Sequence, residues 1–413
     1  MSNKIIVVGG GASGMMAAIV AKRNGADVTI LERNDRVGKK LLATGNGRCN
    51  YTNTTINYNT FLENYHGDNP KFVYSALYSF DLYQTIDFFE MLGITPTVED
   101  NKVYPHSLQA SSVLDVLRYE IENLGIELKT EAYVVDISKE KKFKLKLKDG
   151  RIFEGDKVIL ATGGMAMPAS GSDGNGYSLA KNFNHKILDI FPGLVQLKLE
   201  GNIFKSIKGI KFPGVASLYS NNKYIMEDKG DILFTDYGIS GPPILQLSRT
   251  ALDYQRRNQD IKLRISIVAN RTEEDMKKYL AKRFEFMTKK TIQEGLIGLI
   301  NKRLIIPILK EINVDKDKNV LELSTDELGK LASILTAWDF EITGSQGWGQ
   351  AQVTAGGIDT KDIDDKTMES KLVKGLYITG ELLDIDGDCG GFNLQWAWSS
   401  GYVAGFNAAA KIN

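Results

Sequence analysis

Cysteine and histidine are scarce in this chain of 413 residues. Its two cysteines, Cys49 and Cys389, are too few for a disulfide framework or a four-cysteine zinc site. Its three histidines, His66, His106 and His185, have no metal-ligand spacing and no partner motif for a catalytic triad. We therefore expect no metal, and we expect the protein in the reducing environment of the cytoplasm.

The chain also lacks net charge and long apolar segments. Lys plus Arg total 51 and Asp plus Glu total 51, so no net field draws the chain onto nucleic acid or an anionic membrane. Residues 5–21 carry no charge, but four glycines interrupt them where a signal peptide or a membrane span needs continuous apolar helix. We expect no nucleic-acid partner and no stable membrane association.

Glycine, in contrast, is abundant. The chain has 40 glycines, about one residue in ten, together with 43% hydrophobic and 25% charged residues. This mixture is typical of a globular protein with many tight turns. At this length the chain should form two or three domains.

The order of the predicted elements indicates an α/β fold with an insertion. We predict strands over 4–8, 27–31, 126–129 and 156–161, helices over 12–24, 70–92 and 110–123, and a hairpin sheet over 133–154. Short strands over 193–268, helices over 272–337, a strand-rich return over 338–358, a strand over 375–379 and a helix over 393–410 follow. The prediction is a Rossmann-type domain formed by 1–190 and 353–413, with an inserted β-barrel-like subdomain over 191–270 and a helical subdomain with return strands over 271–352.

A glycine motif lies between the first predicted strand and helix. Gly9, Gly11 and Gly14 match G-x-G-x-x-G: the first permits a tight turn, the second lets a pyrophosphate approach the backbone, and the third lets the helix pack on the strand. Glu32 ends the second strand, where a carboxylate accepts the hydroxyls of an adenosine ribose. The motif predicts a dinucleotide site, whether for NAD or FAD, and we assign Ala12, Ser13 and Arg33 to it as well.

Two later segments favour FAD. The strand that ends in Ala161, Thr162, Gly163 and Gly164 resembles the second nucleotide-contact motif of two-dinucleotide-binding-domain flavoproteins. The segment with Gly380 and Glu381 resembles their third motif, in which the acid reaches the ribityl chain. Backbone N–H groups at the start of the last helix would face the flavin N1 and O2. The residues assigned there are Gly391, Phe392, Asn393, Leu394 and Gln395.

Residues 38–53, 233–242, 353–358 and 380–405 together resemble the YhiN/BaiN/RdsA-type flavoprotein family over essentially the whole chain. The resemblance implies FAD in a Rossmann-type domain whose insertion caps the flavin. It also implies that the segment from 40 to 50 wraps the pyrophosphate and one flavin edge and that the backbone of Val134 pairs with adenine. The residues carried over are Lys40, Leu41, Gly45, Asn46, Arg48, Cys49 and Asn50, whereas the pair Asp388-Cys389 departs from the family pattern.

Three functions remain open from the sequence, and no catalytic residue is assigned. The first is an NAD(P)H-dependent reductase of a conjugated carbon-carbon double bond in a small oxo compound resembling a 3-oxo bile acid or steroid. Because only one full dinucleotide fingerprint is present, NADH or NADPH would bind transiently. The second is an oxidase of a small amine or amino ketone such as aminoacetone, releasing hydrogen peroxide. The third is a flavin redox sensor without turnover. We favour the reductase, and we consider Cys49 and Cys389 small thiols rather than a flavin-linked disulfide.

Overall fold

The computed structural model describes residues 3–57 and 59–410. By its internal contacts the chain divides into two compact units. The first consists of Met1–Pro192 and Gln352–Asn413, and the second of Gly193–Ala351. The second unit is therefore inserted into the sequence of the first.

The described part of the first unit is built around a five-stranded parallel sheet in the order β20-β11-β1-β2-β7. Its strands are β1 (Lys4–Val8), β2 (Asp27–Leu31), β7 (Glu127–Lys129), β11 (Lys157–Leu160) and β20 (Leu376–Ile378). Most residues of the central strands are buried, as expected for a sheet covered on both faces. The strand order reverses at β1, and in such sheets ligands bind beyond the carboxyl ends of the strands at that point. The predicted Rossmann-type fold is confirmed.

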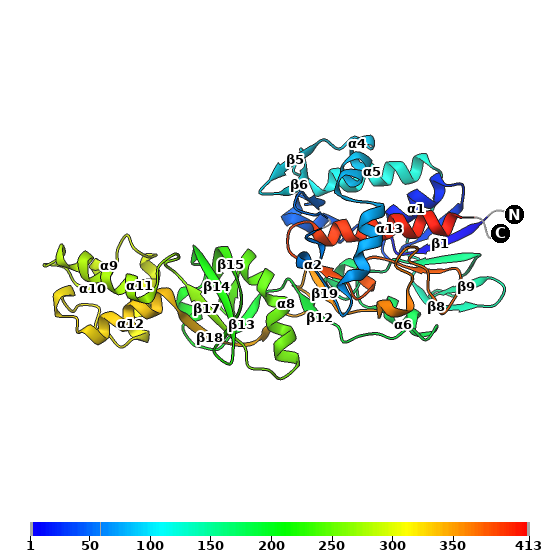
Figure 1. The fold of residues 1–413 in the computed structure, drawn as a ribbon. Helices are drawn as coiled ribbons and strands as arrows, with labels where there is room; N and C mark the ends of the chain where they lie inside the picture. Colours follow the sequence, from blue (N-terminus) through cyan, green and yellow to red (C-terminus); the bar gives the residue numbers. More distant parts are fainter. Residues whose placement is uncertain (1–2, 58, 411–413) are drawn as a thin grey trace. The chain divides into compact units, whose positions relative to one another are not determined.

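Helices α1 (Ala12–Arg23) and α13 (Phe392–Ala409) pack against each other, as the blue and red helices in Figure 1 show. A Cβ atom on Gly401 would lie 2.4 Å from the carbonyl oxygen of Ser13, and one on Gly405 would lie 2.3 Å from that of Ala17. The helices cross this closely because α13 has no side chain at these two positions. The C-terminal helix is thus fixed against the helix of the first glycine motif.

The rest of the first unit consists of short elements around this core. Small sheets have the strand orders β3-β6-β5, β10-β9-β8, β12-β19 and β21-β4, and the strands of the first, second and fourth pair antiparallel. Their strands are β3 (Thr52–Asn53), β4 (Tyr65–His66), β5 (Pro96–Glu99), β6 (Lys102–Pro105), β8 (Val134–Lys139), β9 (Phe143–Leu147), β10 (Ile152–Gly155), β12 (Phe191–Gly193), β19 (Val353–Ala355) and β21 (Asp386–Gly387). The helices and 3-10 turns are η1 (Leu41–Gly47), α2 (Phe61–Asn64), η2 (Pro70–Phe72), α3 (Val73–Ser79), α4 (Leu82–Met91), α5 (Ala110–Asn123), η3 (Pro168–Ser170), α6 (Asn175–Lys181), η5 (Thr360–Asp362) and η6 (Gly380–Leu382).

The prediction of one helix over 70–92 is wrong, because η2, α3 and α4 share this stretch. The break lies at Asp81, whose side chain accepts a hydrogen bond from the backbone N–H of Gln84 while the Gln84 side chain accepts one from the backbone N–H of Asp81. This capping box starts a new helix within a continuous apolar pattern.

The second unit contains a closed antiparallel barrel, β13-β16-β15-β14-β17-β18, which agrees with the predicted barrel-like insertion. Its strands are β13 (Leu197–Leu199), β14 (Lys211–Ser220), β15 (Lys223–Phe234), β16 (Gly238–Ser240), β17 (Lys262–Ser266) and β18 (Trp338–Ser345), and its helices are α7 (Phe204–Ile207), α8 (Pro242–Arg256), α9 (Glu273–Glu285), α10 (Ile292–Gly295), α11 (Lys302–Glu311), η4 (Val320–Glu322) and α12 (Thr325–Thr336). The sequence prediction missed α8, although two prolines in its first turn are a helix-start signal.

Candidate cofactor site and active site

The first glycine motif forms a turn in which Gly9 and Gly14 are tightly packed and Gly11 faces open space. A Cβ atom on Gly9 would lie 2.4 Å from the carbonyl oxygen of Ala161, and one on Gly14 would lie 2.0 Å from that of Gly9. A Cβ atom on Gly11 would have no heavy atom of the described residues within 4 Å. No described side chain caps the N-terminus of α1. The N-terminal turn of α1 thus has uncapped backbone N–H groups beside open space, which suits a phosphate.

Glu32 lies where β2 ends and is 6% exposed. Its Oε2 accepts a hydrogen bond from the backbone N–H of Gly10 at 2.8 Å, and its Oε1 accepts two from Asn34. The carboxylate is therefore held beside the glycine turn. Because Oε1 already accepts two hydrogen bonds and Oε2 accepts one, the free lone-pair position for a ribose hydroxyl lies on Oε2.

Arg33 and the segment before Val134 lie at the end of β2, which Glu32 follows. The guanidinium of Arg33 forms an ion pair with Asp173 and lies over the ring of Tyr133, 4.3 Å from its centroid. The segment that leads to Val134 is joined to the end of β2, because the backbone N–H of Ala132 donates to the carbonyl of Glu32 at 2.8 Å. The structure thus brings Arg33, predicted in the dinucleotide site, and the segment before Val134, predicted at the adenine, to the same strand end.

The carboxyl ends of β11 and β20 meet in a polar cluster. Glu381 forms an ion pair with Lys40, whose Nζ lies 2.8 Å from Oε2. Thr354 donates its hydroxyl to Glu381 Oε1 at 2.8 Å, and its backbone N–H donates to the same oxygen at 3.1 Å. Gly164 lies against both residues, because a Cβ atom there would be 2.3 Å from Thr354 Oγ1 and 2.9 Å from Glu381 Oε1. Lys40, Gly164 and Glu381, three predicted cofactor residues, therefore meet in this cluster, although Lys40 and Glu381 are 341 positions apart.

Thr354 is a residue that the sequence assignment missed. It is fully buried in β19, and its hydroxyl oxygen also accepts hydrogen bonds from the backbone N–H groups of Met165 at 2.7 Å and Ala166 at 3.0 Å. It thus connects the turn after β11 to Glu381. The segment 353–358, which contains Thr354, indicates the family and is the signal in the sequence that points to this residue.

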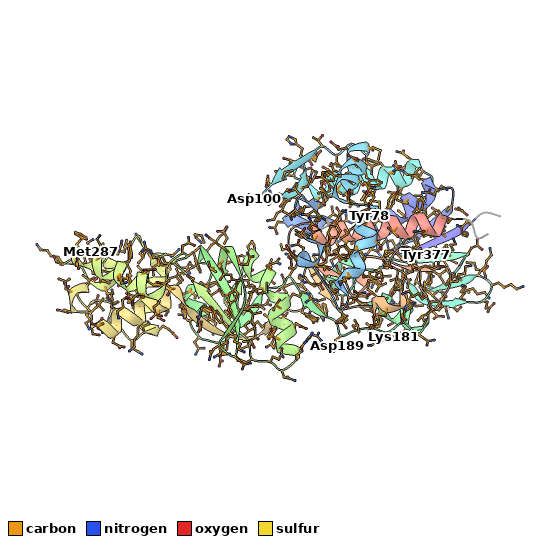
Figure 2. The ribbon with its side chains drawn as sticks, in the orientation of Figure 1. Tyr78, Asp100, Lys181, Asp189, Met287 and Tyr377 are labelled. Carbon is orange, nitrogen blue, oxygen red and sulfur yellow. The ribbon has the colours of Figure 1, made fainter. Side chains whose placement is uncertain are left out.

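The segment from 40 to 50 folds into η1 and a left-handed turn. Gly45 and Asn46 both have positive φ, and Leu41 is buried. Arg48 extends to the β5–β6 hairpin, whose turn residue Asp100 is labelled in Figure 2. There its guanidinium forms an ion pair with Glu99 at 2.8 Å and lies 4.4 Å from the Tyr104 ring centroid. Arg48 is therefore paired within the protein, and its contact with the cofactor stays a prediction.

Asn50 and the start of α13 form the opposite end of the site. The Oδ1 atom of Asn50 is buried and has no hydrogen-bond partner among the residues described. It lies against Gly391, where a Cβ atom would be 2.9 Å from it. Gly391 is the N-cap of α13, and no described side chain caps this helix. An unpaired acceptor and an uncapped helix start therefore lie next to each other.

The first turn of α13 is fixed by its own side chains. Asn393 joins both the backbone N–H and the carbonyl of Gly387, at 2.8 and 2.7 Å. Gln395 is fully buried, accepts from the Thr52 hydroxyl at 2.6 Å and donates to Phe80 O, Thr85 and Ser399. The Gln395 side chain is thus used within the protein, and the half-buried Leu394 and buried Phe392 flank it. These residues orient the helix start.

Cys49 is fully buried, and burial raises the pKa of its thiol to about 12. A thiol with this pKa is almost entirely protonated near neutral pH, and only the thiolate is a strong nucleophile. Thr44 lies in hydrogen-bond contact with it. The geometry supports a packing residue at this position.

These features fit FAD. The open turn at Gly11 and the uncapped start of α1 suit a pyrophosphate, and Glu32 suits a ribose diol. The unpaired Asn50 oxygen and the uncapped start of α13 suit the polar edge of a flavin, which carries both N–H and carbonyl groups. Fold and site together define a Rossmann-type flavoprotein oxidoreductase.

Comparison with known proteins gives the family. The model of the HI0933-like protein Rossmann domain matches residues 3–407, and the chain belongs to this family, as its resemblance to the YhiN/BaiN/RdsA group implied. It is similar to the 3-dehydro-bile acid delta(4,6)-reductase of Clostridium scindens, with 36% identity over 411 residues that cover 99% of this chain and 100% of that one. The chain is accordingly an FAD-dependent oxidoreductase.

Further relatives act on another kind of molecule. The ribosomal RNA dihydrouridine synthases of Escherichia coli and Haemophilus influenzae are 29% and 30% identical and cover 96% and 98% of this chain, and equal shares of their own lengths. The absence of a nucleic-acid partner therefore stays a prediction. Among solved structures, 3-ketosteroid delta1-dehydrogenase from Sterolibacterium denitrificans covers 99% of this chain and 100% of its own, with a TM-score of 0.51 at 11% identity, which shows a shared fold alone.

Two further findings concern membranes and metals. No helix within residues 3–57 and 59–410 combines the length and the apolar character needed to cross a bilayer. In the same part of the chain, no three His, Cys, Asp or Glu side chains are grouped so as to hold a metal ion.

Proposed function

We propose that this chain is an NAD(P)H-dependent reductase of a carbon-carbon double bond conjugated to a carbonyl group, acting on a small oxo compound of the 3-oxo bile acid or steroid kind. The observation that carries the proposal is the identity of 36% to the bile acid reductase, which extends over the whole of that enzyme. Such an end-to-end similarity includes both the cofactor unit and the inserted unit.

The RNA-modifying relatives support the same bond change. Dihydrouridine differs from uridine by two hydrogens across the ring double bond that is conjugated to a carbonyl group. The names of both kinds of relative therefore describe reduction of a conjugated double bond, although the molecules that carry it differ. We infer that the common chemistry resides in the residues that hold the cofactor.

Different residues of the first unit would hold different parts of the cofactor. The N-terminus of α1 would hold the pyrophosphate beside Gly11, and Glu32 would hold the adenosine ribose. The ion pair of Lys40 and Glu381 would lie along the ribityl chain. FAD, when bound, supplies two-electron transfer between a nicotinamide and the substrate. The uncapped start of α13 would stabilise the negative charge that collects on the flavin N1 side upon reduction.

The test separates this function from its alternatives. The protein is purified with its flavin, reduced anaerobically with NADH or NADPH, and then mixed with 3-oxo-4-ene steroids and bile acids, oxygen, or uridine-containing RNA. Rapid reduction by a nicotinamide with reoxidation by the enones is the expected result. If only RNA reoxidises the reduced flavin, the substrate is RNA and the proposed class of small oxo compounds is wrong.

Two other outcomes would favour the remaining hypotheses. Reduction by aminoacetone with release of hydrogen peroxide would identify an oxidase. A bound flavin that is reduced reversibly without turnover on any compound would identify a redox sensor. A purified protein that takes up no FAD would contradict every function considered.

A further inference from the structure

His66 and Asp388 are brought together by a small antiparallel sheet beside the start of α13. The His66 Nε2 atom lies 2.8 Å from Asp388 Oδ1, although the two residues are 322 positions apart. The second carboxylate oxygen accepts a hydrogen bond from the Asn64 side chain at 3.1 Å, and the backbone N–H of Asp388 donates to the Asn64 carbonyl at 2.9 Å. Both carboxylate oxygens of Asp388 are thus occupied and its position is fixed.

This pair is joined directly to the predicted flavin end of the site. The sheet pairs β4, which contains His66, with β21, which ends one residue before Asp388. The Tyr65 hydroxyl donates to the Phe392 carbonyl at 2.9 Å, and the Asn393 side chain donates to the Asp388 carbonyl at 3.2 Å. The pair is therefore attached to the first turn of α13.

The pair also remains accessible. The His66 side chain is 30% exposed and that of Asp388 is 16% exposed. An ionised carboxylate only accepts hydrogen bonds, so Asp388 selects Nε2 of His66 as the donor nitrogen. In the imidazolium form the other ring nitrogen, Nδ1, carries a second proton, and this is the proton that the ring can transfer. Histidine held by a carboxylate in this way is a common general acid and base.

We propose that His66 is the general acid of the reaction and that Asp388 is its positioning residue. This assignment rests on the proposed reductase function. Reduction adds a hydride equivalent to the β-carbon of the enone, the π electrons move toward the carbonyl, and a proton from His66 Nδ1 forms the new bond at the α-carbon. NAD(P)H supplies the hydride equivalent and becomes NAD(P)+, and a proton from the solvent restores the imidazolium.

The test uses His66→Gln, because a glutamine amide can still donate to Asp388 but carries no transferable proton. Its rate of flavin reoxidation by an enone should fall by about 10² to 10⁴-fold. Reduction by NAD(P)H and reoxidation by oxygen need no proton from His66 on the substrate carbon, so both rates should stay within about twofold of wild type. His106→Gln, a change at an exposed histidine, is the matched control and should leave all three rates unchanged.

Asp388→Asn provides a second variant with a readout independent of turnover. The chain has three histidines, so the ring-nitrogen NMR signals of His66 can be assigned by their loss in His66→Gln. Wild type should show a protonated Nε2, and Asp388→Asn should change this signal and slow the enone step while FAD content stays constant.

Two results would contradict the assignment in different ways. If enones reoxidise wild type and His66→Gln at the same rate, His66 is not the acid and the reductase function stands. If no enone reoxidises the reduced wild-type flavin, the proposed function fails and the assignment fails with it.

Discussion

Replacing Thr354 by valine should destabilise the first unit and weaken FAD binding, because the change removes one hydroxyl and keeps the shape of the side chain. The hydroxyl accepts hydrogen bonds from two backbone N–H groups and donates one to Glu381. Thr354 and Ala166 are both fully buried, so water cannot replace the lost partner of the Ala166 N–H group.

The magnitude follows from these contacts. An unsatisfied buried donor costs about 1–3 kcal/mol, and a hydrogen bond to a charged group contributes about 1.5–3 kcal/mol. The expected loss in the free energy of unfolding is therefore about 2.5–6 kcal/mol, without counting the half-buried Met165 N–H. Thr354→Ser keeps the hydroxyl and loses one methyl group, which should cost about 1 kcal/mol.

The assay compares the valine and serine variants with their flavin bound. Urea denaturation is followed by release of flavin fluorescence, and FAD affinity is measured by titration of the apoprotein. Because Glu381 loses one of its donors, the valine variant should bind FAD at least about tenfold more weakly than the serine variant, which corresponds to about 1.4 kcal/mol. Equal stability and equal affinity of the two variants would refute the reasoning.

Three further predictions test other parts of the first unit. Gly11→Ala should unfold at the same urea concentration as wild type, because Gly11 faces open space, but it should bind FAD at least about tenfold more weakly. Gly14→Ala should lose stability, because its Cβ atom would meet the Gly9 carbonyl. Similar unfolding midpoints for the two variants would contradict this expectation. Cys49 should resist iodoacetamide at pH 8 until the protein is unfolded, because burial and a pKa raised to about 12 leave little thiolate, and mass spectrometry of the native protein that finds Cys49 alkylated would exclude this. Gly405→Leu should lower the melting temperature measured by calorimetry, because its side chain would meet the backbone of Ala17, and an unchanged melting temperature would argue against the close helix crossing.

The local parts of the fold could be predicted from the sequence because their signals lie within a few residues. The strand, glycine turn and helix over 4–23 are encoded by β-branched residues, a G-x-G-x-x-G spacing and an alanine-rich helix, and all appear in the structure. The hairpin sheet over 134–155 was equally clear from its alternating pattern. In contrast, the break at Asp81 depends on a capping box that an apolar pattern of helical period conceals.

The contacts within the site could not be predicted, because they join residues that are far apart in the chain. Lys40 was assigned with its segment to the pyrophosphate and one flavin edge, and Glu381 to the ribityl chain. No local pattern around either residue indicates that they form an ion pair. Arg48 was assigned to the cofactor, but its pairing with Glu99 depends on where the β5–β6 hairpin lies. The sequence identifies the segments of the site, and tertiary packing decides which of their polar groups remain available.

Helix α13 explains why both ends of the chain are needed for one site. Along the helix, Gly401 and Gly405 fix it against α1, whose N-terminus is the predicted pyrophosphate contact. At its start, the Gln395 side chain forms hydrogen bonds with Thr52 in β3 and Thr85 in α4. A shift of α13 would therefore change the predicted pyrophosphate and flavin contacts together. The position of α13 depends on the missing side chains of Gly401 and Gly405 and on the buried amide of Gln395. Most substitutions at these positions would therefore weaken cofactor binding, although none of the three residues touches a reacting atom.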